Sequence, residues 1–220
     1  MYFELSCLDA YKEILEFHNF LLSFFMLMPV MKYVQNYTLR NNQTIQRKIN
    51  QYTSWNIYMI IAHYIIQNHY NINNIYVSKF IALNSLHIFL VYHGFVIYDK
   101  RILFEILDNP KAFLLNIGVF QNTFAHIEYL IINFFIHILP VYVYWNFIFE
   151  PLPGITISNM TIYTTLFKFM WALNIFGSFD VISIYSPSFD FCCIKLFNMV
   201  LIFDYGLGFL LENYKHYLVI

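Results

Sequence analysis

The sequence has little charge: only 11% of its 220 residues are Asp, Glu, Lys or Arg, whereas 60% are hydrophobic. A soluble domain has about 25% charged and about 45–50% apolar residues, so this chain lacks the polar groups that would cover a water-facing surface. Six Pro, six Gly and three Cys residues exclude collagen-like, disordered and disulfide-stabilised chains. The net charge of −1 gives no basic surface for nucleic acid. An integral membrane protein with the lipid bilayer as its main partner remains.

Residue types with GC-rich codons are also scarce. Gly, Ala, Pro and Arg are few, whereas Phe (25), Tyr (19), Ile, Asn and Lys, whose codons are rich in A and T, are abundant. This bias indicates an AT-rich genome, such as that of an organelle, a large virus or an AT-rich protist. We therefore expect an endomembrane, a viral or host membrane, or the mitochondrial inner membrane as the location.

Apolar stretches of about 20 residues, the length that crosses a bilayer as a helix, occur six times. We expect an all-α fold, a polytopic transmembrane helical bundle that forms one domain over residues 1–220. Segments 150–154 and 185–188 read as loops because of their Pro, Gly and Ser residues. The expected spans are residues 17–34, 52–70, 78–98, 124–148, 161–184 and 192–211.

The distribution of Lys and Arg predicts the orientation of these spans, because basic residues gather on the cytoplasmic or matrix side. In a six-span chain, both termini would face away from that side. The inner side would carry eight of the twelve basic residues: Lys32, Arg40, Arg47, Lys48, Lys100, Arg101, Lys111 and Lys195. The other side would carry Lys12, Lys79, Lys168 and Lys215.

Polar residues inside the expected spans need a partner or a role, because each is costly in hydrocarbon. His126, Asn133 and His137 share one helical face, which we expect to point into the bundle. Further polar residues inside the spans include Thr53, His63, Asn84, His87, His93, Glu128, Asn174, Asp180 and Asp204.

Two functional roles and one structural role fit such residues. Asp, Glu and His could form a proton relay, Thr53 with a His could act as an activated nucleophile, and any of these groups could join helices by hydrogen bonds. A metal site is not expected, because no His pair has the HxxxH spacing and the three cysteines have no metal-binding spacing. No cofactor is expected either.

Four short motifs resemble the androgen-induced-protein family of multi-span membrane threonine hydrolases, which cleave fatty-acid esters of hydroxy fatty acids. They follow one another in the family's order over most of the chain. The motifs are Gln51-Tyr52-Thr53-Ser54-Trp55-Asn56; Tyr98-Asp99-Lys100-Arg101 with Leu107-Asp108-Asn109; Asn133, His137, Leu139 and Pro140; and Leu207-Gly208 with Asn213-Tyr214.

The resemblance implies a lipid-ester hydrolase with Thr53 as nucleophile and His137 as base. Asn133 would orient the imidazole or donate to an oxyanion. On the expected spans, however, His126 lies near the depth of Thr53, whereas His137 lies eleven residues, about 16 Å, deeper. Both His137 and His126 therefore remain candidate partners of Thr53.

A non-catalytic membrane subunit is the alternative function. An organelle-encoded component of a respiratory or ATP-synthase complex would account for the AT-rich bias and the low number of basic residues. The partners of such a subunit would be other membrane proteins, and its buried His, Asp and Glu residues would join helices or conduct protons.

Overall fold

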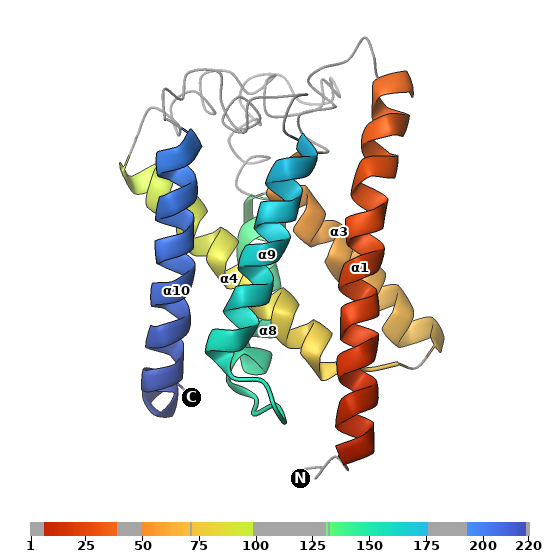
Figure 1. The fold of residues 1–220 in the computed structure, drawn as a ribbon. Helices are drawn as coiled ribbons and strands as arrows, with labels where there is room; N and C mark the ends of the chain where they lie inside the picture. Colours follow the sequence, from red (N-terminus) through yellow and green to blue (C-terminus); the bar gives the residue numbers. More distant parts are fainter. Residues whose placement is uncertain are drawn as a thin grey trace.

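The computed structural model is a bundle of helices (Figure 1). It describes residues 7–38, 50–70, 72–98, 131, 133–175 and 193–218. Its helices are α1 (Cys7–Thr38), α3 (Tyr52–Tyr70), α4 (Ile75–Tyr98), α8 (Leu139–Phe149), α9 (Ile157–Ile175) and α10 (Cys193–Leu218), and the π-helical turn η1 (Phe134–Ile138) leads directly into α8.

The predicted all-α class is confirmed for the described residues. In this part of the chain the β-structure amounts to one isolated bridge between Leu152 and Ile155, which closes a turn at Gly154, where φ is +74°. Each of the six expected spans overlaps one helix or, for the fourth, η1 with α8. The stretches 124–130 and 176–184 of the expected spans lie outside the described residues.

Two of these helices are long and apolar enough to cross a membrane by length and composition, at Leu8–Thr38 and Ile75–Gly94. The core helix of a soluble protein can have the same properties, and Ile75–Gly94 is largely buried within the bundle. The two helices therefore give weak support for a membrane protein. The six crossings stay a prediction.

Successive helices run in alternating directions (Figure 1). The upper end of the bundle contains the last residues of α1, α4 and α9 and the first residues of α3, η1 and α10. The opposite, lower end contains the first residues of α1 and the last residues of α10, with the turns at 72–74 and 150–156. Successive membrane crossings require this alternation, and an even number of crossings requires that the first and last helices begin and end at the same side, as α1 and α10 do.

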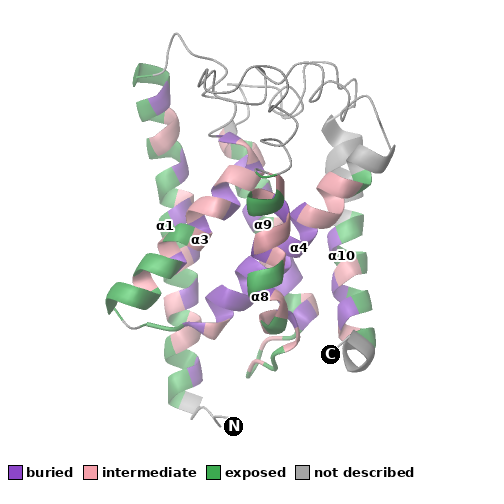
Figure 2. Ribbon diagram, turned by 180° about the vertical axis from the view of Figure 1, so that it is seen from behind, coloured by how far each residue is buried: buried purple, intermediate pink, exposed green. Residues whose placement is uncertain are grey.

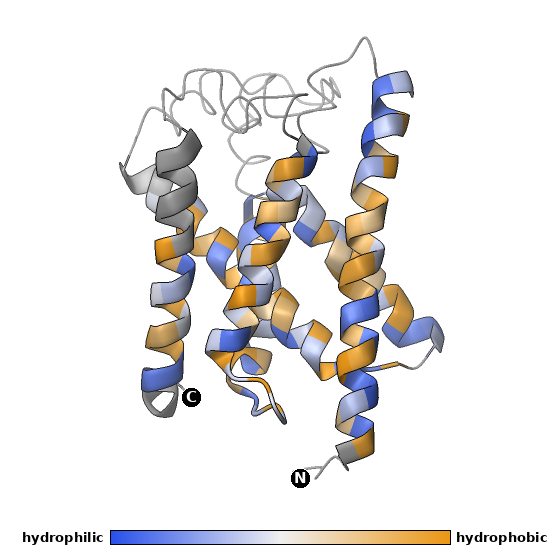
Figure 3. Cartoon of the chain, viewed as in Figure 1, coloured by the Kyte–Doolittle hydropathy of each residue, from blue (hydrophilic) through white to orange (hydrophobic). Residues whose placement is uncertain are grey.

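Helix α4 forms the centre of the bundle and packs against α1, α3, α8 and α9. Its residues from Tyr76 to Ile88 are almost all buried, and Figure 2 shows the buried residues gathered along it. The outer helices keep large apolar side chains exposed. Figure 3 shows apolar residues interspersed with polar ones along these helices. Helix α4 therefore lies in the core, although several of its buried side chains are polar.

The turn η1 has its cause in Pro140. Proline has no N–H to donate to the carbonyl four residues earlier, and its ring clashes with that carbonyl. The N–H of Leu139 instead bonds to the carbonyl of Phe134, five residues back. This wide turn carries His137, and π turns of this kind often occur at functional sites.

Candidate functional site

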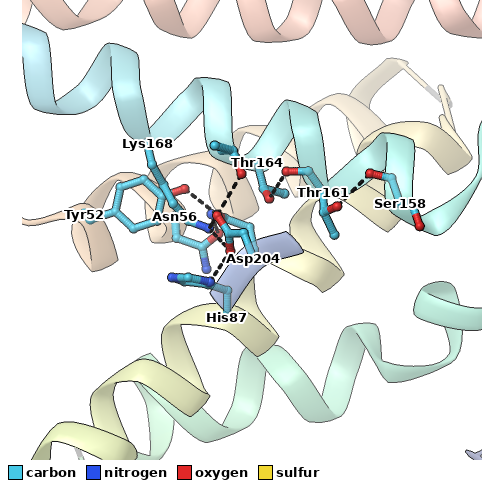
Figure 4. A network of polar contacts seen from close by, with 10 residues as sticks. Tyr52, Asn56, His87, Ser158, Thr161, Thr164, Lys168 and Asp204 are labelled. Carbon is cyan, nitrogen blue, oxygen red and sulfur yellow. Dashed lines mark hydrogen bonds and ion pairs between the residues drawn. The ribbon is translucent and has the colours of Figure 1, made fainter. Parts of the chain in front are cut away.

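Four polar side chains from three helices meet in the core, and we call them the Asp204 cluster: His87 on α4, Thr165 and Lys168 on α9, and Asp204 on α10 (Figure 4). The Lys168 Nζ donates to both carboxylate oxygens, at 2.7 Å to Oδ1 and 2.6 Å to Oδ2. The Thr165 hydroxyl donates to Oδ2 at 2.9 Å, and Nδ1 of His87 contacts Oδ1. Each carboxylate oxygen thus has two polar partners.

The cluster is withdrawn from solvent. Asp204 is 2% exposed, His87 4% and Lys168 6%. An isolated charge in such a place would be very costly, whereas a hydrogen-bonded pair of opposite charges offsets much of its own desolvation. Removing Asp204 would therefore leave Lys168 as a buried charge without its partner.

The contact between α9 and α10 positions the cluster. The two helices are antiparallel: Glu212 accepts a hydrogen bond from the backbone N–H of Ile157 at 2.9 Å, and one turn further along Gly208 faces Thr161. The next turn brings Asp204 to Thr165 and Lys168. A Cβ at Gly208 would lie 2.7 Å from Thr161 Oγ1, so glycine allows the close approach.

A second set of polar side chains joins α3 to α4. The Tyr52 hydroxyl donates to Asn84 Oδ1, and Asn84 Nδ2 donates to Asn56 Oδ1 at 2.7 Å. Asn56 Nδ2 in turn donates to the Ser85 hydroxyl at 3.0 Å. All four residues are buried. These side chains therefore link the two helices by hydrogen bonds that satisfy one another.

A third set places a hydroxyl beside an imidazole. Nδ1 of His63 lies 3.1 Å from the Tyr144 hydroxyl, and Nε2 lies 3.4 Å from the Ser78 hydroxyl. A nucleophile, a base and an orienting group have this order in hydrolases. Ser78, however, is fully buried and also donates to the carbonyl of Asn74. The arrangement thus gives a substrate no access to the hydroxyl.

The structure places the expected Thr53–His dyad as follows. Thr53 lies half-buried in the first turn of α3. None of the hydrogen bonds among the described residues joins Thr53 to an imidazole. His63 contacts Tyr144 and Ser78 instead, and His87 contacts Asp204. His126 lies outside the described residues.

His137 is buried, as expected, but it contacts α4. Its ring stacks on Tyr92 with centroids 3.9 Å apart and planes 12° from parallel. Asn133, one turn earlier, is half-buried, and its Oδ1 has no hydrogen-bond partner among the described residues. The contact between His63 on α3 and Tyr144 on α8 relates the positions of Thr53 and His137 along the two helices. Thr53 lies ten residues before His63, about 15 Å along α3, and His137 lies seven residues before Tyr144, about 10 Å along η1 and α8. The dyad stays a prediction.

Two lysines occupy positions that the sequence analysis did not expect. Lys79 and Lys168 were assigned to the outer side of the membrane, but both are buried in the bundle. Lys79 donates to the carbonyl of Glu150 at 2.6 Å, and Lys168 pairs with Asp204. Lys79 therefore lies near the lower end of the bundle, which is the outer side in the expected topology, whereas Lys168 lies in the interior of α9.

A pattern in the sequence could have revealed the role of Lys168. Thr161, Thr165 and Lys168 recur every three or four residues and so form a polar stripe on an otherwise apolar helix. Such a stripe indicates a buried polar partner on a neighbouring helix. Asp204, which the sequence analysis did select, is that partner.

Within the described ranges, no group of three or more His, Cys, Asp or Glu residues is arranged to hold a metal ion. Comparisons of the chain with known protein families, with characterised proteins and with solved structures find no match.

Proposed function

We propose that this chain is an integral membrane protein that crosses the bilayer six times and serves as a non-catalytic subunit of a membrane assembly. In this proposal the Asp204 cluster joins α4, α9 and α10. The observation that carries the structural role is that both carboxylate oxygens of Asp204 are occupied by donors from the same chain. A catalytic carboxylate or imidazole would need a lone pair that faces a substrate.

Two features support the six crossings. The helices alternate in direction and expose large apolar side chains on their outer surfaces. The sequence segments 39–49, 99–130 and 176–192, which connect upper ends of helices, together contain six Lys and Arg residues, whereas 72–74 and 150–156, at the lower end, contain none. This distribution follows the positive-inside rule, with Lys12, Lys79 and Lys215 as the basic residues toward the lower end.

The structural role of the cluster is tested with Asp204→Leu, Lys168→Met and the double variant. Asp204→Leu leaves Lys168 buried without its counter-charge, so we expect it to lower the free energy of unfolding by about 3–5 kcal/mol. Lys168→Met costs less, because Asp204 keeps His87 and Thr165. The double variant removes both charges and should be more stable than Asp204→Leu alone. Thermal unfolding of the purified protein in detergent measures all three.

Additive losses in the double variant would contradict this proposal, because they would mean that the two charges do not stabilise each other. The matched control is Thr165→Val, which removes one neutral hydrogen bond and should cost only about 1 kcal/mol.

The hydrolase suggested by the sequence resemblance remains a separate prediction. If Thr53 is the nucleophile, Thr53→Ala and His137→Ala should each abolish hydrolysis of fatty-acid esters of hydroxy fatty acids, and Thr53→Ser should keep part of the activity. The assay uses the detergent-solubilised protein, with Ser54→Ala as control. Activity that persists in Thr53→Ala would refute the dyad.

A further inference from the structure

The N-terminal part of α1 is joined to the start of α4 toward the lower end of the bundle (Figure 1). The side chain that joins them is Asn74, which is buried in the turn that precedes α4. Its Oδ1 accepts a hydrogen bond of 3.1 Å from the backbone N–H of Val77 and so caps α4. Its Nδ2 donates to the backbone carbonyl of Glu13 at 2.7 Å and to Glu16 Oε2 at 3.3 Å. The turn before α4 thus holds α1 through side-chain hydrogen bonds.

The carboxyl group of Glu13 has an unfavourable position for a charge. Its Oε2 is buried and has no hydrogen-bond partner among the described residues. Asp9 lies four residues earlier and Glu16 three residues later on α1, so the three carboxyl groups share one helical face, and both neighbours repel a charge on Glu13. A carboxylate that loses water without gaining a donor, beside like charges, favours its neutral, protonated form.

The other titratable groups around this contact have different partners or positions. Lys79 and Tyr76 of α4 each donate to a backbone carbonyl of the turn that follows α8, at 2.6 and 2.9 Å. On the side of α9, Nε2 of His18 lies 3.0 Å from a tyrosine hydroxyl. Lys12 is exposed on α1. Among the described residues, no hydrogen bond or ion pair therefore joins the carboxyl group of Glu13 to a cation.

We propose that the contact between the N-terminal part of α1 and the start of α4 is a proton-sensitive switch. When the carboxyl group of Glu13 is protonated, the contact is closed. When that group is charged, repulsion by Asp9 and Glu16 and the lost hydration of its buried oxygen weaken the contact, and residues 7–16 loosen from α4. The remainder of α1 keeps its position, because Phe17 and the apolar residues that follow it on the same face are buried in the core.

The direction of the pH dependence follows from the form that the closed contact favours. Protons bind more tightly to Glu13 in the closed contact than in the unfolded chain, so its contribution to stability is complete below the ordinary pKa of a glutamate, about 4.3. This contribution is lost as the pH rises further. In the proposed topology the lower end faces outward, so the switch responds to the pH outside the membrane. The contact itself does not depend on that topology.

Thermal unfolding of the purified protein in detergent at pH 4 and pH 7 tests the switch. Glu13→Gln copies the shape of the neutral carboxyl group and cannot ionise. We expect this variant to unfold about 2 °C or more above the natural protein at pH 7 and at the same temperature as the natural protein at pH 4. Glu150→Gln is the control, because Glu150 is exposed at the same end, and it should match the natural protein at both pH values. A Glu13→Gln variant without a gain at pH 7, or with the gain of Glu150→Gln, would overturn the switch.

A nitroxide label on α1 measures the loosening directly. After the natural cysteines are replaced by Ser, the label is attached at Tyr11→Cys or, as control, at Leu22→Cys, since both positions are exposed on the same helix but only the first lies within 7–16. We expect the spectrum at Tyr11→Cys to show higher mobility at pH 7 than at pH 4, and this difference to vanish when Glu13→Gln is added. The spectrum at Leu22→Cys should not change. Equal mobility of Tyr11→Cys at both pH values would refute the switch, whatever the number of membrane crossings.

Discussion

At the scale of single residues, the many polar side chains in the core of this apolar chain bond to one another. Tyr52, Asn56, Asn84 and Ser85 satisfy one another, and the charges of Lys168 and Asp204 are paired. The partners come from different helices in each set. A polar group that is buried without a partner costs free energy, so the need for a partner on another helix specifies which helices become neighbours.

Tyr52→Phe tests the set of side chains between α3 and α4. The substitution keeps the ring but removes the donor to Asn84 Oδ1, which is then left buried with one partner fewer. We expect a loss of about 1–3 kcal/mol in the free energy of unfolding. Tyr64→Phe on the same helix is the control, because Tyr64 is exposed and its substitution should change stability little. Equal effects of the two variants, measured by thermal unfolding in detergent, would contradict the account.

Part of this site could be predicted from the sequence. His63, Asn84, His87 and Asp204 were selected because a polar residue in an apolar helix needs a partner. The identity of each partner could not be derived, since it depends on which helices become neighbours and on their rotation. Lys168 was missed because a lysine between apolar residues was counted as a marker of a membrane surface.

At the scale of elements, the antiparallel contact of α9 and α10 depends on the absence of a side chain at one position. Gly208→Val should lower the free energy of unfolding by about 1–3 kcal/mol, because its side chain would overlap Thr161. Gly206→Val is the matched control: Gly206 lies on the same helix, and its added Cβ would meet no atom within 4 Å apart from its chain neighbours and the nearby backbone of its own helix. Thermal unfolding in detergent measures both.

Thr161→Ala provides the complementary test, since it removes both Thr161 atoms, Oγ1 and Cγ2, that lie closest to the added Cβ. Combined with Gly208→Val, it should restore much of the lost stability. A Gly208→Val variant as stable as Gly206→Val would show that the helices can separate at no cost.

The helices themselves were largely predictable, whereas their ends and irregularities were not. Apolar stretches located all six helical regions, because lipid-compatible helices need long apolar runs. The expected span 17–34 lies within α1, but the helix extends beyond it at both ends, over Cys7–Thr38, which apolarity alone did not predict. The turn η1 was not expected, although Pro140 gives its physical reason.

At the scale of the whole molecule, alternating helix direction and the distribution of basic residues agree on one topology. Thr38 lies at the upper end of the bundle, and Asn73 and Glu150 lie in the turns at the lower end. All three residues are exposed. In the proposed six-span topology the two ends would lie on opposite sides of a membrane, with the upper end on the side that attracts basic residues.

The most direct test of this account is the reaction of single cysteines with a membrane-impermeant maleimide in intact cells that express the protein. Cys7, Cys192 and Cys193 are first replaced by Ser, and one cysteine is then introduced at Asn73, Glu150 or Thr38. The account predicts that Asn73→Cys and Glu150→Cys react from outside and that Thr38→Cys reacts only after the membrane is permeabilised. Reaction of Thr38→Cys and Asn73→Cys from the same side would contradict the six-span topology.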